Sequence, residues 1–318
     1  MDSLASWHSR ITAAAARLQT IVQETPLERA SWPHNVLLKL EHLQPTGSFK
    51  IRGATNKISL LTPEQAAAGV ITASNGNHGI AVAAAASRKG IHAEVFISSH
   101  VSPAKLHRIQ QYGASFQRTG SDPLDAELAA RKAALESGKV FISPYNDIDV
   151  IAGQGTIGLE LHRQAPHIDA VFVAAGGGGM IGGIGAFLKS VSPRTEIVGC
   201  WPEHSPVLYE CMQAGRIHEV REQPTLSEST AGGLEPDSVT LDLCRNVVDR
   251  GVLVSEAEIL AAMRHVLDTE HWLIEGAAGV PVAAFLKEEA RYQGKTVVIV
   301  ICGRNVSPPV LNQLLAAS

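Results

Sequence analysis

A lysine in the first turn of a predicted helix is the first residue whose position points to chemistry. Lys50 follows the turn at residues 44–47, and Ser48 is a suitable N-cap for a helix that begins at Phe49. The positive end of a helix dipole disfavours a cation, which lowers the pKa of that amine. A nucleophilic or Schiff-base lysine needs such a lowered pKa. A surface lysine in a basic turn with Arg52 is the alternative interpretation.

A second segment of small polar residues joins a predicted strand at Val70–Ala73 to a predicted helix at Ile80–Lys89. Backbone N–H groups, a hydroxyl and side-chain amides at a helix N-terminus can bind a carboxylate. An ordinary capped helix start is the other interpretation, although one cap needs fewer polar side chains than this segment has. The segment consists of Ser74, Asn75, Gly76, Asn77 and His78.

A run of glycines, Gly176–Gly179, separates a predicted strand from a predicted helix. Such a loop lets N–H groups converge on an anion, and phosphate is the expected ligand. The spacing Gly177-x-Gly179-x-x-Gly182 also matches the dinucleotide fingerprint, with Glu196 as the ribose-binding acid. A nicotinamide-dependent oxidoreductase is therefore one alternative, and a purely structural tight turn is another.

In this order and spacing, these three segments resemble the fold-type II pyridoxal-phosphate enzymes, and most closely the serine/threonine dehydratase group. The resemblance covers nearly the whole chain, from Thr25-Pro26-Leu27 to Ile301–Asn305. Within this group, the chain is similar to the threonine dehydratases and to the hydroxyectoine-utilization or phenylserine dehydratase subgroup. It implies an α/β fold like that of the tryptophan synthase β-subunit, with two open parallel-sheet domains and pyridoxal 5'-phosphate in the cleft between them.

The resemblance also implies a role for each matching residue. Lys50 would form the internal aldimine and then act as the base at the substrate Cα. Phe49 would lie beside the pyridine ring, Asn77 would bind its 3-oxygen, and Cys302 would face its nitrogen. The phosphate would be bound by Gly176, Gly177, Gly178, Gly179 and the N–H group of Met180. The substrate carboxylate would be bound by Ser74, Asn75, Gly76 and His78.

The implied reaction converts a β-hydroxy amino acid, of the threonine or serine type, to a 2-oxo acid and ammonia. A racemase or a β-replacement enzyme of the same fold is the alternative within the family. Asn75 stands where related racemases carry a second-face serine, which disfavours racemisation. Trp201 and Gly232 stand where cation-binding relatives have acids, although Glu203 is nearby. We therefore expect no metal site and a substrate larger than serine.

The elements that must position these residues alternate between strand and helix, which is typical of mostly parallel α/β sheets. We expect residues 1–46 and 149–318 to form a large domain and residues 47–148 an inserted small domain. Residues 223–237 are the longest expected irregular connection. Strands are expected at 36–41, 70–73, 93–98, 140–143, 170–175, 196–200, 251–254 and 296–301. Helices are expected at 6–22, 80–89, 104–111, 123–136, 155–163, 180–190, 256–268 and 277–289.

The composition fits a globular protein. The 318 residues are 45% hydrophobic and 18% charged, with a net charge of −4. No basic block suggests nucleic acid, and no apolar stretch is long enough to span a membrane. The N-terminus lacks the pattern of a signal peptide, and the 4 cysteines are widely spaced. These features predict a cytoplasmic protein, and the family resemblance predicts a homodimer.

Overall fold

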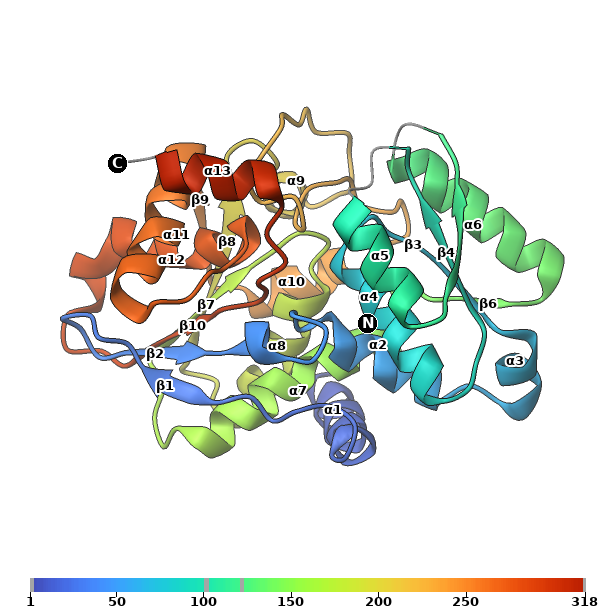
Figure 1. Ribbon diagram of the computed structural model, residues 1–318. Coiled ribbons are helices and arrows are strands. Elements are labelled where there is room, and N and C mark those ends of the chain that lie inside the picture. The colour runs from blue at the N-terminus through green and yellow to red at the C-terminus, as the bar shows by residue number, and fades with distance from the viewer. Residues whose placement is uncertain (1–2, 100–102, 121–122, 317–318) are drawn as a thin grey trace.

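The computed structural model describes residues 3–99, 103–120 and 123–316, whose strands form two separate sheets (Figure 1). The larger sheet has six strands. Their order is β1 (Leu27–Arg29), β2 (Val36–Lys39), β10 (Val297–Val300), β7 (Ala170–Ala174), β8 (Glu196–Pro202) and β9 (Arg250–Val254). Within the described residues, every ladder of this sheet is parallel except that between β1 and β2.

The smaller sheet has four parallel strands, all of which lie between residues 70 and 141. Their order is β5 (Ser115–Arg118), β4 (Ala93–Ile97), β3 (Val70–Ala73) and β6 (Val140–Phe141). Two open sheets with parallel strands confirm the predicted α/β fold class. The division at residues 47–148 into a small inserted domain stays a prediction.

Helices cover both faces of the larger sheet because its central strands are apolar throughout. Every residue of β7 and β10 is buried, as expected for parallel strands packed on two sides. In Figure 1, α11 (Glu256–Glu270) and α12 (Gly276–Glu288) lie on one side. The other side has α1 (Leu4–Leu18), α7 (Ile148–Gln164), α8 (Gly179–Val191) and α10 (Thr240–Val247). The remaining elements of this part are η1 (Glu41–Leu43), α9 (Val207–Ala214), η2 (Glu289–Tyr292) and α13 (Pro308–Ala316).

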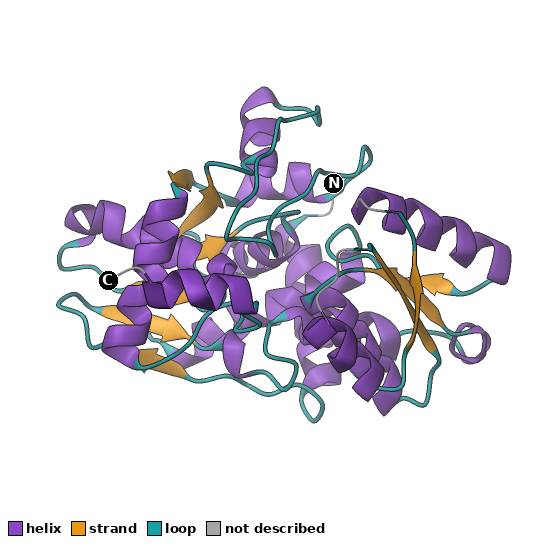
Figure 2. Ribbon diagram, turned by 45° about the horizontal axis from the view of Figure 1, so that its top comes forward, coloured by secondary structure: helices purple, strands orange, loops and turns teal. Residues whose placement is uncertain are grey.

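The two central strands of the smaller sheet, β3 and β4, bury alternate side chains on opposite faces. Val95 packs with α4 (Asn77–Arg88), α5 (Pro103–Gln111) and α2 (Lys50–Ser59), whereas Phe96 packs with α6 (Pro123–Ser137). Figure 2 shows α6 on one side of this sheet and the other helices on the opposite side. The short helix α3 (Pro63–Ala68) leads from α2 into β3.

Helix α2 joins the two sheets by packing closely against α7. The two helices meet at glycines: a Cβ atom on Gly153 would lie 2.6 Å from the Gly53 Cα and 2.8 Å from the Arg52 carbonyl oxygen. The Gly53 N–H group also donates to the Gln154 Oε1 at 3.2 Å. The position of Lys50 at the start of α2 is therefore tied to α7.

Most predicted elements are confirmed, with shifts at their ends. The chain between α9 and α10, residues 215–239, contains neither helix nor strand, so the predicted long connection is confirmed. The predicted cap is wrong: Phe49 occupies the N-cap position of α2, and the Ser48 hydroxyl has no hydrogen-bond partner among the described residues. Ser48 instead forms a β-bridge with Gly303, a long-range contact that no local pattern indicates.

The glycine contact predicts a stability difference between two matched substitutions. Gly153→Ala should lower the free energy of unfolding by about 1–3 kcal/mol, because the added methyl group has no space between α2 and α7. Gly233→Ala is the control, since a Cβ atom there would meet nothing within 4 Å. Urea unfolding of both variants measures the difference, and equal stabilities would contradict the close contact.

Candidate active site

Lys50 lies at the N-terminus of α2, the helix that joins the two sheets. Its Nζ donates a hydrogen bond to the Pro144 carbonyl oxygen at 2.8 Å and lies 5.2 Å from the centre of the Phe49 ring. The Phe49 N–H group donates to the Cys302 carbonyl oxygen at 3.1 Å. The structure thus brings together the predicted residues Lys50, Phe49 and Cys302, which are far apart in the sequence.

Burial controls the protonation of the Lys50 amine and the Cys302 thiol. It lowers the pKa of Lys50 to about 8, and electrostatic interactions with Cys302 and Glu275 only partly offset this effect of burial. Burial also raises the pKa of the Cys302 thiol well above its usual value. Near neutral pH the amine is therefore close to its deprotonation point, and Cys302 is a neutral thiol beside it.

Asn77 is held by a network that sequence reasoning missed. Its Nδ2 donates to both carboxylate oxygens of Glu275, at 2.8 and 3.0 Å, and its Oδ1 accepts from the Asn305 Nδ2 at 2.6 Å. The Asn305 N–H group donates to Glu275 at 3.1 Å. A Cβ atom on Gly303 would lie 2.6 Å from the Glu275 Cδ, so a glycine is needed there. This network joins α4 of the small sheet to the loops around β10 and α12.

The other residues of the polar segment differ in their surroundings. The Ser74 Oγ accepts from the Gly76 N–H group at 3.1 Å, which shapes the loop. The Asn75 side chain donates to the Ser98 Oγ at 2.7 Å and accepts from the Ser98 N–H group at 2.8 Å. Asn75 is therefore fixed to the end of β4, and both halves of its amide are already bonded.

His78 is buried close to Lys50 and is neutral. Burial, and then the Lys50 cation, lower its pKa to about 3. Its Nε2 lies 3.0 Å from the Ile142 carbonyl oxygen, and since a carbonyl only accepts, Nε2 carries the proton. The Nδ1 atom is buried without a partner in the described structure. His78 thus keeps an unpaired acceptor atom in the interior of the described structure.

The glycine loop follows β7 and leads into α8. Gly178 has a φ of +89°, a left-handed conformation that favours glycine. A Cβ atom on Gly176 would lie 2.8 Å from Thr230, and one on Gly177 would lie 2.3 Å from the Tyr145 ring. Since α8 begins at Gly179, the first N–H groups of this helix, including that of Met180, have no partner within it. The loop is therefore suited to bind an anion.

Glu196 does not lie where the dinucleotide interpretation of the glycine loop requires its ribose-binding acid. Glu196 pairs in register with Ala170, at the amino end of β7, whereas the glycine loop follows the carboxyl end. The Glu196 carboxylate accepts hydrogen bonds from Arg250 and the Tyr292 hydroxyl, at 3.1 and 3.0 Å. A ribose-binding acid would have to lie at the carboxyl edge of the sheet.

Tyr145 and Glu235 are further residues of the site that the sequence did not reveal. The Tyr145 ring covers Gly177, and its hydroxyl accepts from the Glu235 N–H group at 2.8 Å. The Glu235 carboxylate accepts from Asn146 at 2.8 Å and pairs with Arg131 at 2.6 Å. The connection between α9 and α10 is thereby attached to the small sheet beside the glycine loop.

Trp201 and Glu203, at the position where cation-binding relatives have an acid, have surroundings that do not form a metal site. Trp201 is fully buried and packs on Tyr209, with ring centres 5.5 Å apart. Glu203 lies 4.0 Å from Lys287 in an ion pair. Among the residues that the structure describes, no three His, Cys, Asp or Glu side chains are grouped as metal ligands. The expectation of no metal stays a prediction.

Comparison with known proteins gives one family and one fold. A family model described as "Pyridoxal-phosphate dependent enzyme" matches residues 18–303. The L-threonine ammonia-lyase of Thermotoga maritima is 37% identical over 310 residues, which cover 96% of this chain and 77% of that protein. A threonine deaminase structure from Solanum lycopersicum superimposes with a TM-score of 0.93 at 30% identity, covering 100% of this chain and 95% of the other. Maize serine racemase gives 0.90 at 30% identity, with coverages of 97% and 96%.

The lowered pKa of Lys50 can be measured by competitive acylation over a range of pH. On protein treated with hydroxylamine and then dialysed, so that no bound aldehyde blocks the amine, Lys50 should reach half of its maximal labelling near pH 8, because burial disfavours the ammonium form. Mass spectrometry of the peptide that contains Lys50 gives the labelled fraction. Half-labelling near the ordinary lysine value of 10.5 would contradict this environment.

Proposed function

Because this chain belongs to the family of pyridoxal-phosphate dependent enzymes, we propose that it is an ammonia-lyase that converts a β-hydroxy amino acid to a 2-oxo acid and ammonia. The single observation that carries the proposal is the buried Lys50 amine, which lies beside a neutral thiol and an aromatic ring. The relative from Thermotoga maritima bears the name L-threonine ammonia-lyase, which supports the same reaction class.

The residues of the site fit pyridoxal 5'-phosphate. The glycine loop has no room for side chains at Gly176 or Gly177 and offers the free N–H groups of α8 to a phosphate. Lys50 would hold the cofactor covalently, and Phe49 would lie along its ring. Asn77 would bind the 3-oxygen through its Nδ2, which would exchange a hydrogen bond to Glu275 for one to the cofactor.

Cys302 would face the ring nitrogen as a neutral hydrogen-bonding partner. Its raised pKa means that it carries no negative charge to draw a proton onto that nitrogen. When bound, pyridoxal phosphate supplies an electron sink for negative charge at the substrate Cα. A neutral partner keeps this sink moderate, which suits elimination better than transamination.

The protein's own contribution is to bind, orient and move one proton. The N–H groups of residues 74–78 and the Ser74 hydroxyl would bind the substrate carboxylate. The His78 Nδ1 carries no proton, so it could only accept a hydrogen bond from a donor group of the substrate. Lys50, neutral in part near pH 8, takes the proton from the substrate Cα. Loss of the β-hydroxyl as water then leads, after hydrolysis, to the 2-oxo acid and ammonia.

Racemisation would need a second acid–base group on the other face of the substrate. Asn75 occupies the corresponding position, and an amide does not exchange a proton usefully. Its hydrogen bonds to Ser98 also hold it in place. We therefore favour elimination over racemisation, although maize serine racemase has the same fold. A β-replacement reaction remains the alternative use of the same site.

The state and location of the protein are also proposals. We propose that it acts in the cytoplasm as a homodimer. All 4 cysteines are buried and free, which supports a reducing compartment. In the described part of the chain, no helix combines the length and apolar character needed to cross a membrane.

The substrate and its independence of metal can be tested together. We expect ammonia release from threonine or phenylserine to exceed that from serine, because Gly232 stands where cation-binding relatives have an acid, so a polar contact to a small substrate is lost. We also expect EDTA and added magnesium to have no effect, since Trp201 offers no oxygen ligand.

Ammonia release is measured with each amino acid, with and without EDTA or magnesium. Lys50→Ala is the blank, and it should lose at least about 1,000-fold in kcat. Strong activation by magnesium, or serine as the best substrate, would contradict the expected pocket. Release of the opposite enantiomer without ammonia would contradict the proposed lyase.

A further inference from the structure

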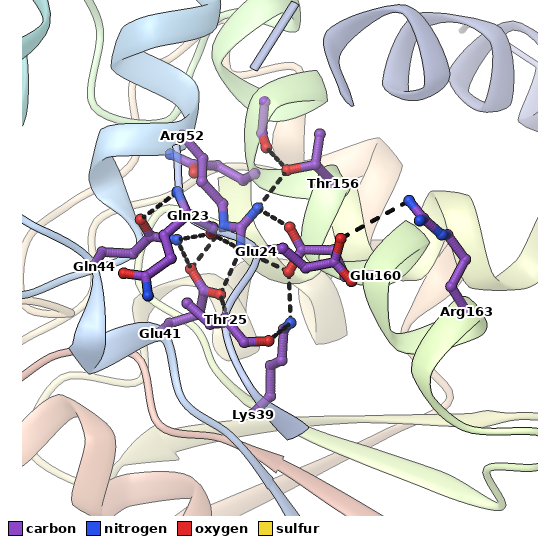
Figure 3. A network of polar contacts seen from close by, with 12 residues as sticks. Gln23, Glu24, Thr25, Lys39, Glu41, Gln44, Arg52, Thr156, Glu160 and Arg163 are labelled. Atoms are coloured by element: carbon purple, nitrogen blue, oxygen red, sulfur yellow. Dashed lines mark hydrogen bonds and ion pairs between the residues drawn. The ribbon is translucent and has the colours of Figure 1, made fainter. Parts of the chain in front are cut away.

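Arg52 is buried and uses every hydrogen-bond donor that it has (Figure 3). Its Nε and Nη2 donate to the two oxygens of Glu41, each at 2.7 Å. Its Nη1 and Nη2 donate to the two oxygens of Glu160, at 2.5 and 2.8 Å, and Nη1 also donates to the Thr156 hydroxyl at 3.0 Å. A guanidinium group has five N–H donors in a fixed plane, so these contacts define the orientation of the side chain.

Lys39 completes a balanced set of charges. It is fully buried, and its Nζ donates to Glu160 at 2.5 Å, to the Thr25 carbonyl oxygen at 2.7 Å and to Gln164 at 3.0 Å. We name Lys39, Glu41, Arg52 and Glu160 the Arg52 cluster. Its two cations and two carboxylates come from β2, η1, α2 and α7, which Figure 3 shows converging at this point.

Arg52 and Lys50 lie on opposite sides of the same helix turn. Residues two positions apart in an α-helix project about 200° apart around its axis. Arg52 therefore points into the cluster while Lys50 points into the site, where its amine contacts Pro144. Any rotation of the first turn of α2 that moved Arg52 would also move the Lys50 amine.

The chain before Lys50 is fixed by separate contacts. The Ser48–Gly303 bridge and the hydrogen bond from Phe49 to Cys302 hold the two preceding residues to the end of β10. Since Phe49 provides no side-chain cap for α2, the orientation of the first turn depends on contacts made by the residues after Lys50. Arg52 is the next charged residue and has directional contacts to two other elements.

We propose that Arg52 is a positioning residue which, through Glu41 and Glu160, fixes the rotation of α2 and so places the Lys50 amine in the site. The proposal rests on the role of Lys50 in the proposed function. Arg52 does not touch Lys50, so it acts only through the helix. Buried ion pairs can often be replaced by apolar residues without loss of stability, so a purely structural role would tolerate that exchange.

Two charge-balanced double variants separate positioning from stability. Arg52→Met with Glu41→Gln removes one cation and one carboxylate, and it also removes the anchor of α2. Lys39→Met with Glu160→Gln also removes one cation and one carboxylate, but it leaves the two hydrogen bonds from Arg52 to Glu41. Neither variant leaves an unpaired charge in the cluster, so each is expected to fold.

The holoenzymes are compared by kcat, by the visible absorbance of the lysine-linked cofactor and by urea unfolding. We expect the variant without Arg52 to lose about 10- to 100-fold in kcat, the scale for a displaced catalytic group. Its cofactor absorbance should be weaker, with slower recovery after the cofactor is removed and added back. The variant without Lys39 should lose clearly less in both, because Arg52 keeps its two hydrogen bonds to Glu41 and can still donate to the amide oxygen at position 160. Equal losses in the two variants, or full activity without Arg52, would overturn the proposal.

A readout independent of activity is the pH profile of Lys50 acylation. Loss of the anchor should raise the pKa of Lys50 from about 8, because the amine is no longer held in its buried position. An unchanged profile would overturn the proposal even if kcat fell. If the wild-type protein released no ammonia from any substrate, the proposed function would fail, while this comparison would still decide the role of Arg52.

A single variant covers the case in which a double variant does not fold. Arg52→Lys keeps the positive charge but has three donors at one atom instead of a planar fork. As in the double variant without Arg52, the pKa of Lys50 should rise and kcat should fall. Lys39→Arg, which keeps the charge at the other cation, should change neither. The same profile for both single variants would contradict positioning by Arg52.

Discussion

The Arg52 cluster constrains the rest of the molecule. Charges removed from water are tolerated only when each has partners in good geometry, and here two cations and two carboxylates satisfy one another in the interior. The cluster therefore fixes β2, η1, α2 and α7 relative to one another. Close glycine contact between α2 and α7 is the second half of this constraint, because it brings the backbones together where Arg52 reaches Glu160.

Within this frame, burial explains the chemistry of the site. It lowers the pKa values of Lys50 and His78 and raises that of the Cys302 thiol. His78 and Cys302 are therefore neutral near neutral pH, and the Lys50 amine loses its proton near pH 8. Burial also raises the pKa of Glu275, and the hydrogen bonds from Asn77 and the Asn305 backbone only partly offset this. A neutral amine that can accept a proton, beside a neutral partner for a heterocyclic nitrogen, is the arrangement that elimination at an amino acid requires.

Local patterns carried the fold class, the family and the cofactor, and all three expectations are confirmed. Lys50, the segment from Ser74 and the glycine loop are recognisable because each is a short strand–loop–helix junction whose residue types are constrained within a few positions. Contacts between distant segments have no local sequence pattern from which they could be predicted. Glu275, the pairing of Tyr145 with Glu235 and the bridge made by Ser48 depend on the approach of separate elements. The position of Glu196 at the opposite edge of the sheet likewise followed only from strand register.

The central claim is that the Lys50 amine carries the cofactor and performs the proton transfer. Borohydride reduction of the protein loaded with pyridoxal phosphate, followed by proteolysis and mass spectrometry, tests it most directly. The account predicts that the pyridoxyl group is found on Lys50, with loss of ammonia release in proportion to the labelled fraction. A label on another lysine, or activity that survives complete labelling, would contradict it.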